Sequence, residues 1–83
     1  VEWSRIEPTE GRWDASAIEW YRELVAECER LGLLPMLTLH HFTSPQWFID
    51  DGGFTSGKSV PRFTRYTEKV LQELGPRIPL WCT

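Results

Sequence analysis

The sequence PMLTLHHFTSPQWF, residues 35–48, is the stretch that decides the fold. It begins as a short, uninterrupted apolar run, which is typical of a strand buried on both faces of a parallel sheet. The run leads directly into His40, His41 and Phe42, and α/β sheets bind ligands at the carboxyl edge of their strands. Side chains alternate between the faces of a strand, so His41 shares a face with Leu39 and His40 lies on the other. The stretch therefore predicts a site at a strand end that only one of the two histidines can face.

His41 has two interpretations. It is either a histidine satisfied by hydrogen bonds in a packed loop, or it donates to a sugar hydroxyl beside aromatic walls formed by Phe42 and Trp47. We expect His40 to pack behind the strand. No metal site is predicted, because the HExxH spacing is absent and no Asp, Glu or Cys follows the histidines at a ligand spacing.

The segment upstream of this stretch predicts an amphipathic helix. Asp14 is a good N-cap, and the helix is expected to end at about Leu31, where Gly32 supplies a left-handed residue. Residues 1–6 predict the tail of a strand, and residues 7–12 predict a turn. The helix carries apolar side chains at three- and four-residue spacing, which predict one buried stripe: Ile18, Tyr21, Leu24, Val25, Cys28 and Leu31.

Downstream, residues 44–49 predict a short helix whose first two residues are the N-cap and N1 positions. A second long helix is predicted with Ser59 as its N-cap, and Gly75 and Pro76 are expected to end it as Gly32 ends the first one. Residues 80–83 predict the start of a last strand. The second long helix has its own predicted stripe: Phe63, Thr67, Val70, Leu71 and Leu74.

The predicted order of elements is strand, helix, strand, helix, strand, with single-helix crossovers. Such crossovers imply parallel strands and right-handed connections. A doubly wound sheet and an eight-stranded barrel share this alternation, and the absence of GxGxxG and GxxxxGK[ST] favours the barrel. Both ends of the chain fall inside predicted strands, so we expect a piece of a larger parallel α/β protein.

Length and composition exclude several classes of protein. A chain of 83 residues holds at most one domain, and its net charge of -3 disfavours a nucleic-acid partner. No apolar run approaches the roughly 18 residues that span a bilayer, so no membrane partner is expected. Cys28 and Cys82 lack a metal spacing and are predicted to be buried free thiols, which fits a reducing, cytoplasmic compartment.

The carboxylates do not form an obvious catalytic pair. Glu7 and Glu10 flank a Pro/Gly loop with no apolar surroundings, and we expect both to be solvated. Asp50 and Asp51 are interpreted as loop and capping residues, and Arg5 as a buried side chain that holds strand ends together. No catalytic residue is therefore predicted within the chain.

Several landmarks occur in a fixed order along the chain. They are Trp3–Pro8 with Gly11, residues 33–42, Gly52–Phe54 and residues 80–83. In order and spacing, over the whole chain, they resemble family 1 glycoside hydrolases.

The resemblance implies a (β/α)8 barrel, with residues 1–83 as a single fragment running from the end of its second strand to the start of its fourth. It implies a retaining β-glycosidase of the β-glucosidase type, acting on a small-molecule β-glycoside with a terminal β-linked sugar and using no cofactor. His41 matches the family's sugar-binding histidine, and Phe42 stands where many members have tryptophan. Neither catalytic glutamate of the family has a match; its acid/base lies in an Asn-Glu-Pro motif expected directly after Thr83. A non-catalytic sugar-binding or interaction module, and a piece of another barrel glycosidase, remain as alternatives.

Overall fold

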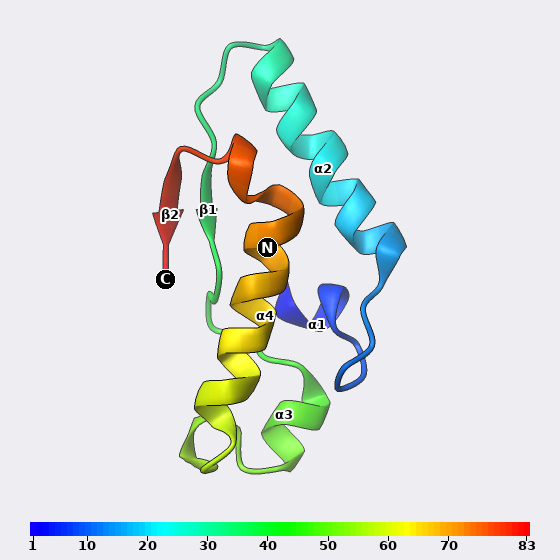
Figure 1. The fold of residues 1–83 in the computed structure, drawn as a ribbon, viewed down its shortest axis with the longest axis vertical. Coiled ribbons are helices and arrows are strands. Elements are labelled where there is room, and N and C mark those ends of the chain that lie inside the picture. The colour runs from blue at the N-terminus through cyan, green and yellow to red at the C-terminus, as the bar shows by residue number, and fades with distance from the viewer.

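The computed structural model describes residues 1–83 and contains two long helices beside a pair of strands (Figure 1). In this view α4 lies between the strand pair and α2, and the molecule measures 41 × 23 × 20 Å along its principal axes. The elements in chain order are α1 (Trp3–Ile6), α2 (Ala15–Arg30), β1 (Met36–Thr38), α3 (Gln46–Asp50), the 3-10 helix η1 (Gly53–Thr55), α4 (Ser59–Leu74), the 3-10 helix η2 (Gly75–Arg77) and β2 (Leu80–Cys82).

The two strands are parallel, as predicted. Met36 pairs with Leu80 and Thr38 with Cys82, and the chain crosses from one strand to the other mainly through α4. The prediction that this strand is buried on both faces is wrong for the chain as it stands. Met36 is 61% exposed, and Leu37 and Thr38 are only partly buried.

The prediction that residues 1–6 form the tail of a strand is wrong. Residues Trp3–Ile6 form the short helix α1, and only Glu2 before them has an extended backbone, with φ -98° and ψ 114°. The amino group of Val1 donates to the carbonyl of Thr38 at 3.0 Å, which places the chain start beside β1. Trp3 and Ile6 are both buried, and residues three apart share a helix face. A run of six residues was too short to distinguish this spacing from alternation.

Helix α2 follows its local signals closely. The Asp14 carboxylate accepts from the backbone N–H groups of Ser16 at 2.9 Å and Ala17 at 3.1 Å, which confirms the predicted N-cap. Gly32 has φ +72° and follows the helix, again as predicted. The stripe is only partly confirmed, since three of its members are buried, Ile18, Tyr21 and Val25, whereas Leu24 and Leu31 are exposed and Cys28 is half-buried.

Helix α4 ends where predicted, but it differs from the prediction at its first residue, in the conformation of Gly75 and in part of its buried face, of which only Val70 and Leu74 were predicted. Ser59 is its first residue and Lys58 its N-cap. The helix ends at Leu74 with Gly75 as its C-cap, as predicted, but Gly75 has φ -53° rather than a left-handed conformation, and the chain continues directly into η2. The buried residues of the helix are Ser59, Arg62, Tyr66, Val70 and Leu74, whereas Leu71 is exposed and Phe63 and Thr67 are only partly buried.

Helix α3 begins one residue later than predicted. Pro45 is the N-cap and Gln46 the first helical residue. The hydroxyl of Ser44 makes no cap, because it lies 2.9 Å from Nε2 of His40.

Trp3 lies at the centre of an aromatic cluster in the core. Its ring is 4.6 Å from that of Phe48, 4.9 Å from Tyr66 and 5.8 Å from Trp47, measured between centroids. The short helix α1 is thus anchored against α3 and α4, below the carboxyl ends of the strands. None of the helices combines the length and the apolar character that a membrane crossing needs. The buried core consists of Trp3, Ile6, Ile18, Tyr21, Val25, Leu39, Phe48, Tyr66, Val70, Leu74 and Ile78.

Candidate functional site

The two histidines lie in the loop that follows β1, which ends at Thr38, and they have different surroundings. The predicted shared face of His41 and Leu39 is not observed, because Leu39 is buried and His41 is exposed. Nε2 of His40 lies 2.9 Å from the Ser44 hydroxyl, and its ring packs edge-on against Phe54 with centroids 5.2 Å apart. His40 is therefore partly buried within the protein, in agreement with its predicted packing role. His41 is exposed, and its ring lies 4.5 Å from that of Phe42. Of the two, only His41 presents its ring to solvent at the strand end.

Phe42 has an unusual backbone and an unusual degree of exposure. Its φ is +66°, and it is the only residue other than glycine with a positive φ. For a bulky side chain this region costs about 1–3 kcal/mol and persists only where the surroundings hold it. The side chain is 93% exposed, so its apolar ring is displayed to solvent beside His41.

A hollow of about 480 Å³ adjoins His41 on the side of α2. Thr43 donates to the Glu2 carboxylate at 2.8 Å, which ties the loop after β1 to the residues that precede α1. The residues that line the hollow come from β1 and the loop after it, from α1 and the residues before it, and from α2. Its lining consists of Val1, Glu2, Arg5, Trp20, Tyr21, Leu24, Thr38 and His41.

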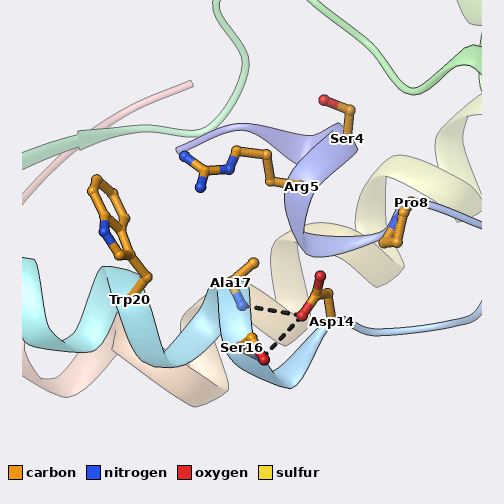
Figure 2. A pocket seen from close by; sticks show the side chains of 7 residues that line it. All are labelled: Ser4, Arg5, Pro8, Asp14, Ser16, Ala17 and Trp20. Atoms are coloured by element: carbon orange, nitrogen blue, oxygen red, sulfur yellow. Dashed lines mark hydrogen bonds between the residues drawn. The ribbon is translucent and has the colours of Figure 1, made fainter.

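Arg5 is exposed, which corrects its predicted role as a buried clamp between strand ends. It projects from α1 into a second hollow of about 410 Å³, where its guanidinium carbon lies 5.1 Å from the centroid of the Trp20 ring (Figure 2). The Asp14 carboxylate in the same hollow is already engaged by the N-terminus of α2. The prediction was wrong because residues 3–6 form a helix rather than a strand. On this helix Arg5 points away from Trp3 and Ile6, which are buried.

Glu7 is the largest departure from expectation, because the predicted solvated carboxylate is 0% exposed. Its side chain accepts from Trp3 Nε1 at 2.9 Å and from the backbone N–H of Gly11 at 2.7 Å, and it pairs with Arg65. Its backbone carbonyl accepts from Trp47 Nε1 at 2.9 Å. One residue thus joins α1, the following turn, α3 and α4.

Glu10 and Asp51 meet at a buried arginine from α4. Arg62 Nε lies 2.6 Å from a Glu10 carboxylate oxygen, and its Nη1 lies 2.7 Å from Asp51. The prediction that Glu10 is simply solvated is therefore incomplete, because it is exposed but paired. Asp51 is the C-cap residue of α3, in agreement with its predicted capping role, and is paired as well. Asp50 is the last residue of α3 rather than a loop or capping residue, and its carboxylate accepts from Gln46 at 2.8 Å within the helix. The sequence did not reveal Arg62, since a charged residue on an apolar helix face has no local signature of its distant partners.

The Asp51 ion pair predicts a pH dependence of stability. A hydrogen bond from Arg62, supported by the charge of that guanidinium, lowers the pKa of Asp51. A carboxyl group with a lowered pKa contributes stability above its ordinary value, about 3.9 for Asp, and loses it as the pH falls through the lowered value. We expect Asp51→Asn to be less stable than the unaltered protein at about pH 7, with a difference that shrinks as the pH falls below the ordinary pKa of an aspartate. Urea denaturation across this range measures the difference, and a difference that stays constant contradicts the assignment. In an Arg62→Gln background the pH dependence of the Asp51→Asn difference should disappear.

The cysteines are both free. Cys28 is half-buried on α2, whereas Cys82 on β2 is exposed, so the prediction that both are buried is wrong. No group of three or more His, Cys, Asp or Glu side chains is placed to hold a metal ion.

The fold and the strand end together define a class of protein. It is a parallel α/β protein in which a histidine and an aromatic side chain are displayed where a strand ends, the position at which such folds bind ligands. The sequence matches the model of glycosyl hydrolase family 1 over residues 1–83. The chain belongs to that family.

Similar proteins carry related names. A 6-phospho-beta-galactosidase of Staphylococcus aureus is 36% identical over 84 residues, covering 100% of this chain and 18% of that enzyme. The apo structure of a beta-glucosidase 1317 has a TM-score of 0.97 at 42% identity, over 100% of this chain and 21% of that one. A beta-glycosidase from Pyrococcus horikoshii has a TM-score of 0.91 at 38% identity, over 98% of this chain and 19% of that one. The chain therefore spans about a fifth of the length of these relatives and matches a part of their structures.

Proposed function

We propose that residues 1–83 are part of the (β/α)8 barrel domain of a retaining β-glycosidase that hydrolyses terminal β-linked sugars. In this proposal the chain runs from the end of the second barrel strand to the start of the fourth. The observation that carries the proposal is the family match over all 83 residues. The parallel pairing of β1 with β2 through α4 is consistent with it, because a barrel of this kind consists of such crossovers.

We assign the wall of the sugar site to His41 and Phe42. His41 would donate a ring N–H to a sugar hydroxyl, and Phe42 would place its ring against the apolar face of the sugar. Their exposure at the end of β1 and the 4.5 Å separation of their rings support this assignment. The hollow beside His41 adds the exposed ring of Trp20 to the same region.

The two catalytic carboxyl groups lie outside this chain in the proposed mechanism. A retaining glycosidase uses one carboxylate to attack the anomeric carbon and a second carboxyl group to protonate the leaving oxygen, before water releases the sugar. Three acidic residues of this chain, Glu7, Glu10 and Asp51, are unsuited to these roles. Glu7 is buried, accepts hydrogen bonds from Trp3 and Gly11 and is paired with Arg65, whereas Glu10 and Asp51 are paired with Arg62.

The test is the stereochemistry of hydrolysis by the complete polypeptide that contains this chain. With an aryl β-glucoside or an aryl 6-phospho-β-galactoside as substrate, we expect the first free sugar seen by NMR to be the β-anomer. The 83-residue chain alone serves as the control and is expected to be inactive. Release of the α-anomer, or no hydrolysis of either substrate, contradicts the proposal.

A second candidate is a non-catalytic sugar-binding module, which is favoured by the engagement of Glu7, Glu10 and Asp51 in internal pairs. A module of this kind should fold as a cooperative monomer when it consists of residues 1–83 alone. The barrel proposal instead predicts an associating or loosely packed species, because unpaired strand edges remain open. Analytical ultracentrifugation together with urea denaturation of the 83-residue chain distinguishes the two.

A further inference from the structure

Tyr66 on α4 contacts the backbone directly before the two histidines. Its side chain is 0% exposed, and its hydroxyl donates to the carbonyl oxygen of Leu39 at 2.8 Å. The N–H of Leu39 donates in turn to the carbonyl of Cys82 at 2.9 Å. Leu39 is thus held by β2 on one side and by α4 on the other, immediately before the loop leaves the sheet.

The position of the Tyr66 hydroxyl is itself fixed. The ring stacks on Trp3 with centroids 4.9 Å apart and an interplanar angle of 14°. Trp3 is held in turn by its hydrogen bond to the buried Glu7. Burial raises the pKa of Tyr66 above its ordinary value, so the hydroxyl remains a donor over the whole working range of pH. A rigid, permanently protonated donor is well suited to hold one carbonyl in one orientation.

The loop beyond Leu39 needs such support. Phe42 adopts a positive φ that bulky residues avoid, and a conformation of this kind survives only when the surrounding contacts determine it. Two other hydrogen bonds of the loop, His40 to Ser44 and Thr43 to Glu2, involve partly or fully exposed groups. The bond from Tyr66 is the one that water cannot readily replace, because it is buried.

We propose that Tyr66 is a positioning residue for the sugar site: its hydroxyl fixes the Leu39 carbonyl and thereby the direction in which His41 and Phe42 project. The inference rests on the proposed function, since it assumes that these two side chains contact the sugar. Nothing in the resemblance or in the pattern of α4 assigns Tyr66 a role. Its distance from the loop in sequence, 27 residues, hides the contact.

The substitution Tyr66→Phe removes the hydroxyl and keeps the ring that stacks on Trp3. In the complete polypeptide we expect kcat/KM for an aryl β-glycoside to fall about tenfold, mainly through a higher KM, because small displacements of binding groups weaken substrate positioning strongly. The kcat should be expressed per folded molecule, with the folded fraction taken from circular dichroism. A loss of fold alone would lower the amount of active protein and leave KM unchanged.

Val70→Ala is the matched control. Val70 is buried on the same helix one turn later, within the core cluster. We expect this variant to melt at a lower temperature with an unaltered KM. An unchanged KM in Tyr66→Phe, or an equal rise of KM in both variants, overturns the inference while the proposed function stands. Absence of hydrolysis by the unaltered polypeptide contradicts the proposed function, and the inference fails with it.

Discussion

Replacement of Glu7 by alanine is expected to lower the free energy of unfolding by about 3 kcal/mol. The substitution leaves the indole N–H of Trp3 and the backbone N–H of Gly11 without their acceptor, and both bonds are buried or partly buried. Removing one member of a buried charged pair usually costs about 3–5 kcal/mol. The lower end applies here because the partner, Arg65, has a side chain that is 39% exposed and can regain water.

The companion variants make the Glu7 prediction specific. Glu7→Gln keeps one carbonyl oxygen but adds an N–H₂ group that faces donors from Trp3, Gly11 and Arg65, so it should recover only part of the stability. Glu68→Ala removes an exposed carboxylate from α4 and is expected to change stability by less than about 0.5 kcal/mol. Urea denaturation of the complete polypeptide provides the comparison. A Glu7→Ala variant as stable as Glu68→Ala would show that the buried network contributes little.

Replacement of His41 by alanine is expected to lower kcat/KM for an aryl β-glycoside about 10²-fold with little effect on stability. The side chain is exposed and no other residue of the chain accepts a hydrogen bond from it, so folding does not depend on it. In the proposed sugar site, its loss would leave a substrate hydroxyl without a partner in a region that the bound sugar shields from water.

Two further variants complete the His41 experiment. Gln46→Ala, on the exposed face of α3, alters a residue outside the proposed site and should leave kcat/KM unchanged. His41→Asn retains an N–H donor on a shorter side chain and should retain part of the activity. If His41→Ala hydrolyses the glycoside as well as the unaltered polypeptide, the assignment of this residue to the sugar wall is wrong.

The sequence predicted those parts of the fold that depend on local chemistry. The N-cap at Asp14 and the left-handed Gly32 define α2 from residues within one turn of its ends. The strand at residues 36–38 followed from a short apolar run that begins at Pro35. The prediction for residues 3–6 was wrong because a single helical turn has too few positions to show a period. Gly75 ends α4 as predicted, but it is not left-handed, because the chain continues into a 3-10 turn.

The candidate site was predictable only in part. The expectation that His40 packs against the protein was confirmed, but the alternation argument placed His41 on the face of the buried Leu39, whereas His41 is exposed in a loop beyond the strand. The burial of Glu7 depends on Arg65, 58 residues away, and on an indole N–H four residues before it. The Trp3 to Glu7 spacing was a local signal that could have been used, because residues four apart on a helix are neighbours. The partner on α4 could not be found without the tertiary structure.

The most direct test of the account is a crystal structure of the complete polypeptide with an uncleaved β-glycoside bound. The account predicts a sugar hydroxyl within about 3.2 Å of a ring nitrogen of His41, with the sugar lying against the ring of Phe42. A glycoside bound with no sugar oxygen in hydrogen-bond distance of His41 would contradict the claim that the end of β1 forms part of the sugar site.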